Sequence, residues 1–409
     1  MALDSIAPDA RLAERPFQRS GVVGREYFWN RADEQARLRS LIAAGEIGFV
    51  EGPRRVGKSS LALLLREELQ REQGWRIGYL NLRSVTSATL PDRLVSVIAA
   101  LAHKGRAAQM ADRVRNLIGW FRIRPEVGAE VDEQGRPRAV LRFAQYRVAD
   151  QHIVFEDIVR FLHEAPKHAG TKVALVIDEF QEVASLAPDL PGLLKAEFES
   201  GKDLAIVLMG SRQSLLHELA YSPSAPLYRI GPTIPVGELP LDIVELEMQR
   251  RFGWAGIPVS SDVAASVHEV CAGIAQDIQT VCSVMLDHAR QEHWSVVDAG
   301  ALPQVLTTVL REVAPRFMDV WLELSPIQQE LLSAIAQFGG SSITGKDFLE
   351  AMNPHLRRTS SVVVKASRAL RDRDLLELDA NGYRLADPFF ALYLRRVASD
   401  PDSADALVS

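Results

Sequence analysis

The strongest chemical signal in the chain is a run of eight residues that matches the pattern G-x-x-x-x-G-K-[ST] at every fixed position: Gly52-Pro53-Arg54-Arg55-Val56-Gly57-Lys58-Ser59. Glycines in such a loop let the backbone N–H groups face phosphate oxygens, and a following helix adds its amino end. The pattern predicts that Lys58 neutralises the β- and γ-phosphates of a nucleotide and that Ser59 holds Mg²⁺. The loop and the adjacent Ser60 are therefore expected to bind nucleotide, with a chance match as the alternative.

A pair of acids follows the most apolar segment of the chain. Residues 173–177 are Val-Ala-Leu-Val-Ile, and Asp178 and Glu179 come directly after them. An unbroken apolar run predicts a strand covered on both faces, so both acids are expected at the carboxyl edge of a sheet beside the phosphate loop. There, Asp178 is predicted to bind Mg²⁺ through water and Glu179 to polarise the attacking water. The alternative is a solvated strand end.

Three further polar positions are candidates for sensing or stabilising phosphate charge. Ser211 and Arg212 follow the apolar segment 204–209, where they could contact a γ-phosphate. Arg229 could stabilise charge in the transition state from its own chain or a neighbouring one, as arginine fingers do. An ordinary turn and a surface arginine are the competing interpretations.

The segments that must position these residues alternate between strand and helix patterns. Strands are expected at 47–51, 76–82, 173–177 and 204–209, and helices at 31–44, 59–73 and 155–164. Residues 90–120 have a mainly helical pattern, and residues near 120–143 suggest a β-hairpin insertion. This order predicts an α/β fold, a three-layer P-loop NTPase domain with a mostly parallel sheet, followed by a helical lid and a winged-helix domain.

The domain boundaries follow from changes in pattern. We expect an N-terminal arm at 1–20, the P-loop domain at 21–240, a helical lid at 241–323, a winged helix at 324–397 and a disordered acidic tail at 398–409. Within the winged helix, helices are predicted at 325–336, 344–353 and 359–373. A hairpin with an Asn-Gly turn is predicted at 375–385.

Several segments together resemble the prokaryotic, archaeal-type P-loop ATPases of the AAA+/STAND class, which are related to origin-recognition ATPases. The resemblance rests on the phosphate loop, on Ile177-Asp178-Glu179-Phe180-Gln181, and on shorter segments at 15–17, 28–34, 210–212, 226–229, 273–279 and 387–390. It implies ATP rather than GTP, adenine-side contacts near Asn30 and Arg31, and ATP- and ADP-bound states that differ in how the lid and winged helix dock. The chain departs from the family's lid motif at Ala275, where a proline is usual.

The segment 357–373 is basic in a chain that is acidic overall. It holds six basic residues against one acid, Asp372. A helical face of Val363, Ala366 and Leu370 would pack inward and leave Lys365 and Arg368 exposed, as on a recognition helix in a major groove. The candidates for contact with double-stranded DNA are Arg357, Arg358, Lys365, Arg368 and Arg371. A protein-docking winged helix or a merely solvated basic face is the alternative.

Composition limits the remaining classes of function. The 409 residues predict two or three domains, and the net charge of −6 argues against a uniformly basic nucleic-acid coat. The two cysteines, Cys271 and Cys282, do not have the spacing of a zinc site. Because no run of about 18 apolar residues or secretion signal is present, we expect a soluble, reduced, cytoplasmic protein without a membrane partner.

These observations lead to two hypotheses. The first is a Mg²⁺-dependent ATPase that uses ATP binding and hydrolysis to switch the lid and winged helix, with double-stranded DNA as target. The second is a nucleotide-gated signalling or scaffold protein whose winged helix docks a protein partner, such as a helper for a transposase, nuclease or defence effector. Either is compatible with a homo-oligomer.

Overall fold

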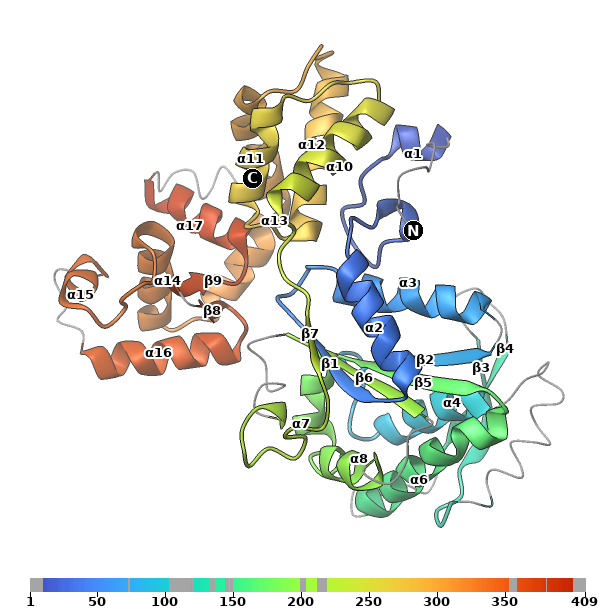
Figure 1. The fold of residues 1–409 in the computed structure, drawn as a ribbon. Helices are drawn as coiled ribbons and strands as arrows, with labels where there is room; N and C mark the ends of the chain where they lie inside the picture. The colour runs from blue at the N-terminus through green and yellow to red at the C-terminus, as the bar shows by residue number, and fades with distance from the viewer. Residues whose placement is uncertain are drawn as a thin grey trace. The chain divides into compact units, whose positions relative to one another are not determined.

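The computed structural model describes residues 10–72, 74–102, 119, 121–131, 137–143, 147, 150–198, 204–211, 219–352, 359–379 and 381–399. The chain divides into two compact units. Residues 31–52 and 58–236 form the first, which we call the sheet unit. Residues 1–30, 53–57 and 237–409 form the second, which we call the helical unit (Figure 1).

The sheet unit is built on five parallel strands: β1 (Ile47–Glu51), β2 (Trp75–Asn81), β5 (Lys172–Asp178), β6 (Leu204–Gly210) and β7 (Thr233–Pro235). Their order in the sheet is β2-β5-β6-β1-β7. The register pairs Ile177 with Leu208 and Gly210 with Glu51, so the carboxyl ends of β5, β6 and β1 meet at one edge. That edge carries the residues that follow each strand.

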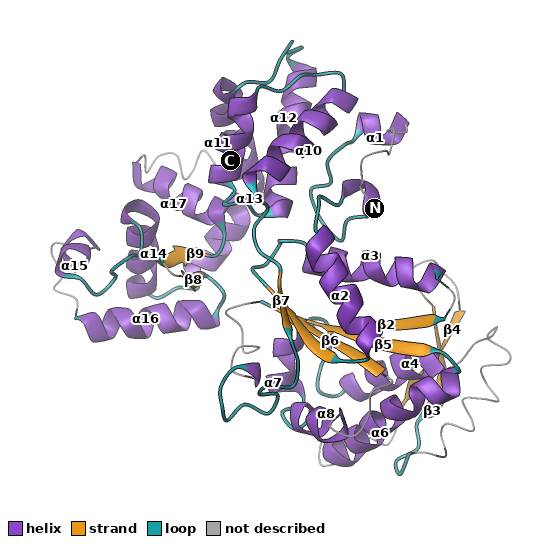
Figure 2. Cartoon of the chain, in the orientation of Figure 1, coloured by secondary structure: helices purple, strands orange, loops and turns teal. Residues whose placement is uncertain are grey.

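Helices cover both faces of this sheet. On one side lie α2 (Ala32–Ala44) and α3 (Lys58–Arg71), and on the other lie α4 (Leu90–Ala102), α6 (Gln151–Ala169) and α8 (Leu190–Phe198) (Figures 1 and 2). Every residue of β6 is buried, as is every residue of β5 after Lys172. Apolar runs of this kind form strands between two helical layers because both of their faces leave water. The predicted three-layer α/β fold is confirmed.

Smaller elements complete the sheet unit. Strands β3 (Glu126–Val131) and β4 (Pro137–Arg142) pair antiparallel within the region where the sequence suggests an inserted hairpin. A 3-10 turn, η3 (Phe180–Glu182), and the short α7 (Val183–Leu186) follow β5 directly. Strand β7 was not predicted, because three residues carry almost no periodicity and its pairing with β1 joins segments far apart in the chain.

The helical unit begins with α1 (Ala10–Glu14) and the 3-10 turn η1 (Arg25–Tyr27), and continues after the sheet unit. Its main helices are α10 (Leu241–Trp254), α11 (Ser261–Val270), α12 (Ala275–Gln291) and α13 (Leu302–Leu322), with a turn η4 (Ala299–Ala301) between the last two. The winged helix follows as α14 (Pro326–Phe338), α15 (Lys346–Met352), α16 (Ser360–Asp372), β8 (Leu376–Asp379), β9 (Gly382–Leu385) and α17 (Pro388–Ser399). Gly382 allows the tight turn between β8 and β9 because its φ is 117°.

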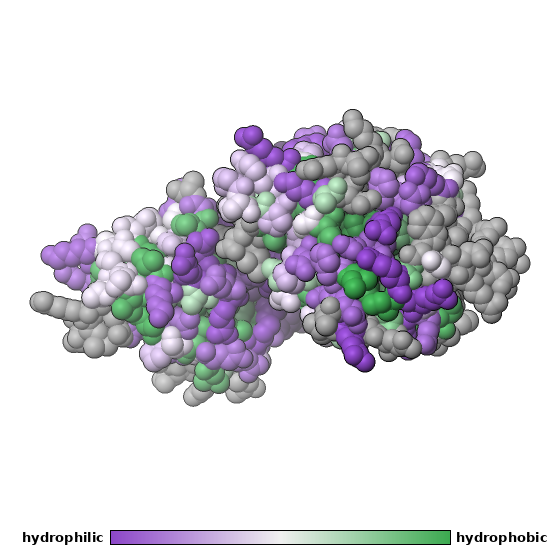
Figure 3. All heavy atoms as spheres, turned by 90° about the horizontal axis from the view of Figure 1, so that it is seen from below, coloured by the Kyte–Doolittle hydropathy of each residue, from purple (hydrophilic) through white to green (hydrophobic). Residues whose placement is uncertain are grey.

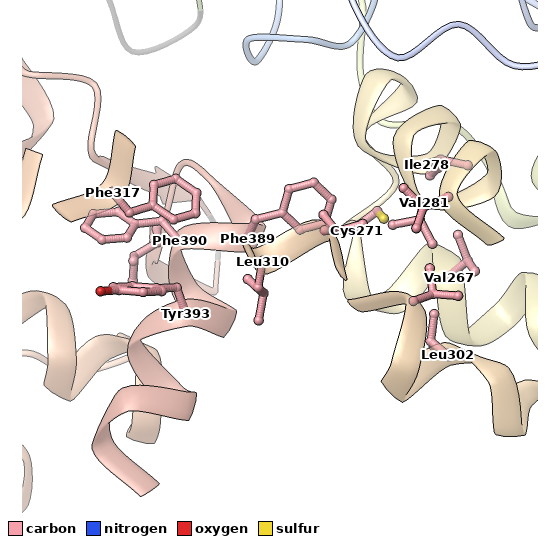
Figure 4. Packing of buried hydrophobic residues seen from close by; sticks show 14 of the residues in the cluster. Val267, Cys271, Ile278, Val281, Leu302, Leu310, Phe317, Phe389, Phe390 and Tyr393 are labelled. Carbon is pink, nitrogen blue, oxygen red and sulfur yellow. The ribbon is translucent and has the colours of Figure 1, made fainter. Parts of the chain in front are cut away.

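One continuous hydrophobic core joins α10–α13 to the winged helix. In Figure 4, Val267, Cys271 and Val281 pack together near α11 and α12, while Phe317 and Phe390 lie ring to ring near Tyr393. The Phe317 and Phe390 ring centroids are 4.9 Å apart. Because α13 contributes to both ends of this core, helices α10–α12 and the winged helix are linked by packing as well as by the chain.

The surface of the protein is mixed in character. On the face shown in Figure 3, apolar side chains form small patches among hydrophilic ones. Among the described residues, no helix has both the length and the apolar character needed to cross a bilayer.

Candidate nucleotide-binding site

The phosphate loop leaves β1 at Glu51 and enters α3 at Lys58, as its pattern requires. Both fixed glycines have a structural reason. A Cβ at Gly52 would lie 1.9 Å from the carbonyl oxygen of Val236, and Gly57 has a φ of 101°. The Lys58 ammonium donates a hydrogen bond to the Gly52 carbonyl oxygen at 2.8 Å. The side chain is therefore folded back over the start of its own loop.

The hydroxyl of Ser59 and the carboxylate of Asp178 meet at the sheet edge. Ser59 Oγ donates to Asp178 Oδ2 at 2.6 Å, while the Glu179 N–H donates to Asp178 Oδ1 at 2.9 Å. Asp178 is 2% exposed. A hydroxyl and a carboxylate are the hard oxygen ligands that Mg²⁺ prefers, so this pair fits the ion that the sequence implies.

Tyr79 also belongs to this cluster, although no sequence motif includes it. Its hydroxyl donates to Asp178 Oδ2 at 2.5 Å from the neighbouring strand β2. Burial, together with the negative charge of Asp178, raises the pKa of Tyr79 well above its ordinary value. The phenol therefore keeps its proton and remains a hydrogen-bond donor.

Glu179 has an unusual backbone conformation. Its φ is 54°, in the left-handed region that non-glycine residues seldom adopt. Its Oε2 accepts a hydrogen bond from Gln181 Nε2 at 2.5 Å, and Gln181 is buried. Strained conformations persist where surrounding contacts enforce them, and they concentrate at functional sites. The side chain of Glu179 is thus fixed by its turn and by Gln181, another partner that sequence reasoning did not assign.

Among the described residues, the other predicted phosphate-sensing residues make no hydrogen bond or ion pair with the Ser59–Asp178 pair. Ser211 is buried and follows Gly210 at the end of β6, whereas Arg212 lies outside the described residues. Arg229 has a φ of 57° and is exposed, with its guanidinium 5.3 Å from the centre of the Tyr228 ring. The structure does not bring Arg229 into contact with Lys58, Ser59 or Asp178 among the described interactions.

The two adenine-side candidates differ in their surroundings. Asn30 has a φ of 26° and is exposed in the helical unit. Arg31 is buried in the sheet unit, where its guanidinium contacts Glu34 at 3.0 Å.

The two arginines inside the phosphate loop belong to the helical unit, and carboxylates of that unit bind both of them. Arg54 pairs with Asp374, which precedes the hairpin of the winged helix. Arg55 pairs with Asp277 of α12 at 2.9 Å and with Asp387, before α17, at 3.1 Å. Sequence reasoning missed these contacts because hundreds of residues separate the partners along the chain.

Asp277 is the most buried carboxylate of this group. It is 2% exposed, and its Oδ2 has no hydrogen-bond partner among the described residues. Burial raises the pKa of Asp277 to about 7, although the Arg55 guanidinium acts in the opposite direction. The carboxyl group is thus close to its titration point near neutral pH.

The basic helix α16 presents the two expected faces. Val363, Ala366 and Leu370 are buried, while Lys365 and Arg368 are exposed. Arg371 is half-buried, and Arg357 and Arg358 lie outside the described residues. Two exposed valines, Val362 and Val364, accompany the cationic side chains.

Comparisons with known proteins give the following relationships. Residues 315–396 match the family described as "Probable winged helix domain". A Walker-type ATPase of Pyrococcus abyssi is similar over 91% of this chain and 97% of its own, with 18% identity and a TM-score of 0.63. The ORC2 protein of Aeropyrum pernix, solved as ADPNP–ADP complexes, is similar over 95% of this chain and 99% of its own, with 14% identity and a TM-score of 0.53. A search of the curated proteins found no match. At these identities the likeness is one of fold: a P-loop ATPase fold followed by a helical region and a winged helix.

Proposed function

We propose that the protein is a Mg²⁺-dependent ATPase that acts as a nucleotide-driven conformational switch. The observation that carries this proposal is the Ser59–Asp178 hydrogen bond of 2.6 Å, which joins a complete phosphate-loop motif to the acid pair at the sheet edge. The fold shared with the Walker-type ATPase of Pyrococcus abyssi supports it.

In the proposed reaction the protein positions a triphosphate and a water molecule. Lys58 exchanges the Gly52 carbonyl for a phosphate oxygen, and residues from Gly52 to Ser60 surround the phosphates. Ser59 and Asp178 would hold Mg²⁺, Asp178 through water, and the ion would neutralise the developing phosphate charge. Glu179 accepts a proton from the attacking water, and the turn that fixes its carboxylate limits the positions that this water can take.

Other residues take supporting roles in this proposal. Ser211 and Arg212 would detect the γ-phosphate, Arg229 would stabilise transition-state charge, and Asn30 and Arg31 would lie on the adenine side. Because Arg229 is exposed and has no described contact with the acid pair, its role requires movement or a neighbouring copy of the chain.

The switch is proposed to work through the loop arginines. Arg54 and Arg55 interact with carboxylates of α12 and of the winged helix, all in the helical unit. Phosphate oxygens would compete with these carboxylates for the two guanidinium groups, because both ligands form charge-assisted hydrogen bonds of similar geometry. Nucleotide occupancy would then change how firmly α12 and the winged helix hold the loop.

Double-stranded DNA is the target we propose, through the face of α16 that carries Lys365 and Arg368. Both side chains are exposed on one helix of a winged helix, while the opposite face is packed into the core. Arg357, Arg358 and Arg371 are further candidates for phosphate contact. We propose that the ATPase acts in the cytoplasm with a protein partner. If Arg229 acts on the nucleotide of a neighbouring copy, the protein would work as a homo-oligomer.

Equilibrium binding of a fluorescent ATP analogue to Lys58→Ala tests the nucleotide site. We expect the variant to lose binding, because it removes the cation that faces the β- and γ-phosphates. The control is Lys167→Ala, which removes an exposed lysine of α6 paired with Glu164. Unchanged affinity in Lys58→Ala would contradict the assignment of the site.

A nucleotide-gated scaffold that docks protein is the second candidate function. The exposed Val362 and Val364 favour it, because apolar side chains beside the cations suit a protein surface better than a phosphate backbone. A DNA-binding titration at two salt concentrations separates the candidates. Binding that weakens steeply with salt supports DNA as target, and binding that is absent or insensitive to salt supports the scaffold.

A further inference from the structure

The carboxylate of Asp178 is held from three directions in the sheet unit. Ser59 Oγ and the Tyr79 hydroxyl both donate to Oδ2, at 2.6 and 2.5 Å, while the Glu179 N–H donates to Oδ1 at 2.9 Å. Two of these donors belong to the phosphate loop and the acid pair. Tyr79 belongs to neither motif.

Strand register explains how Tyr79 reaches this carboxylate. Strand β2 is parallel to β5, and Asn81 lies opposite Asp178 while Tyr79 lies opposite Val176. Side chains two residues apart in a strand point to the same face, so Tyr79 and Asn81 share one face, as do Val176 and Asp178. Tyr79 lies two residues before the end of β2, and its side chain is long enough to place the hydroxyl at the level of Asp178.

We propose that Tyr79 is a positioning residue for the Mg²⁺ site, because its hydroxyl fixes the orientation of the Asp178 carboxylate. This inference rests on the proposed function. In that function Ser59 would contribute oxygen lone pairs to Mg²⁺, and its hydroxyl alone would be left to hold Oδ2 of the carboxylate if Tyr79 were absent. The Tyr79 hydroxyl supplies a second donor to Oδ2 from the neighbouring strand β2.

The magnitude of the effect can be anticipated from other metal sites. Removing a hydrogen-bond partner of a metal-ligating side chain typically costs about 10- to 100-fold in metal affinity. Tyr79→Phe keeps the aromatic ring and its packing and removes only the hydroxyl. We therefore expect the variant to bind nucleotide with wild-type affinity when Mg²⁺ is absent. When Mg²⁺ is present, we expect its affinity for nucleotide to be about 10-fold lower than that of the wild type.

The experiment is a titration of ATP, by calorimetry or with a fluorescent analogue, in excess Mg²⁺ and in EDTA. It compares the wild type, Tyr79→Phe and Tyr221→Phe. Tyr221 is a matched control because its hydroxyl also donates to a carboxylate of the sheet unit, Glu51, at 2.9 Å. The affinity measured in EDTA shows whether each variant keeps an intact nucleotide site.

The expected result is a Mg²⁺-dependent gain in affinity that is present in the wild type and in Tyr221→Phe and largely lost in Tyr79→Phe. If Mg²⁺ raises the ATP affinity of Tyr79→Phe as much as that of the wild type, the role of Tyr79 is overturned while the proposed function stands. If the wild type shows no gain from Mg²⁺, the proposed function fails and this inference fails with it.

Discussion

At the residue scale, the site depends on a few side chains whose surroundings differ sharply from water. Asp277 is the clearest case. It pairs with Arg55 of the phosphate loop at 2.9 Å, and Arg316 of α13, Asp387 before α17 and Cys271 after α11 are the other ionisable groups that interact with it. Burial disfavours its charged form more strongly than the arginines favour it, so its pKa is raised from 3.8 to about 7.

This raised pKa predicts a pH dependence of stability. Between about pH 4 and pH 7 the folded protein retains a proton that the unfolded chain has lost, so the contribution of Asp277 to stability falls as the pH rises through this window. The amide that replaces the carboxyl group in Asp277→Asn cannot titrate, so the variant should lack this contribution to the pH dependence of the unfolding free energy. Relative to the variant, the wild type should lose up to about 4 kcal/mol of unfolding free energy between these limits, since one pKa unit corresponds to about 1.4 kcal/mol.

Urea denaturation at pH 4 and pH 8 measures this difference. Asp319→Asn, which removes an exposed carboxylate from α13, is the control for a simple change of charge. Equal pH slopes for the wild type and Asp277→Asn would show that the carboxyl group of Asp277 titrates as it does in the unfolded chain.

At the element scale, the sequence predicted strands and helices better than the contacts between them. The strands β1, β5 and β6 were found because their apolar runs are bounded by Gly or by charged residues. The role of Tyr79 could not be found, because it depends on which strand lies beside β2 and in what register. The contacts of Arg54 and Arg55 were missed for the same reason, since no local pattern indicates a partner so distant in sequence.

Helix α17 was not predicted from the sequence patterns. The segment Asp387-Pro388-Phe389-Phe390 contributes to the family resemblance, and in the structure Pro388 begins a helix that packs on α13 and α14. Phe390 is 2% exposed and stacks on Phe317. Phe390→Ala should cost about 3–5 kcal/mol of unfolding free energy, because it leaves a cavity where two ring faces meet.

Chemical denaturation followed by circular dichroism checks this expectation. Phe338→Ala is its control, because Phe338 is 58% exposed on the same winged helix and its truncation should change the free energy of unfolding by no more than about 0.5 kcal/mol. Similar losses in both variants would mean that the Phe317–Phe390 packing contributes little.

The basic face of α16 predicts a salt-dependent interaction. Lys365→Ala and Arg368→Ala should each weaken DNA binding across different sequences and lower the slope of log affinity against log salt by about one, because each removes one phosphate contact. Lys346→Ala, on α15, removes an exposed cation outside α16 and should leave the slope unchanged. Fluorescence anisotropy at several salt concentrations gives both quantities, and a slope unaltered by either α16 substitution would exclude this face from the DNA contact.

At the scale of the whole molecule, the phosphate loop is one of the places where the chain passes between its two units. Gly52, Lys58 and Ser59 belong to the sheet unit, while residues 53–57 belong to the helical unit. The fold class was predictable because it follows from alternating strands and helices and from the winged-helix order. The proposed connection between nucleotide and the winged helix was not predictable, because it depends on the carboxylates that bind Arg54 and Arg55.

The central claim is that the protein hydrolyses ATP with Glu179 as the base. Steady-state hydrolysis of ATP and GTP by the wild type, Glu179→Gln and Glu182→Gln, with and without double-stranded DNA, tests this claim most directly. Glu182 lies in the same turn and has no assigned role, so it controls for loss of a neighbouring carboxylate. We predict ATP turnover by the wild type and Glu182→Gln that DNA stimulates, and a rate at least about 100-fold lower in Glu179→Gln, which still binds ATP. Hydrolysis by Glu179→Gln at the wild-type rate would contradict the account.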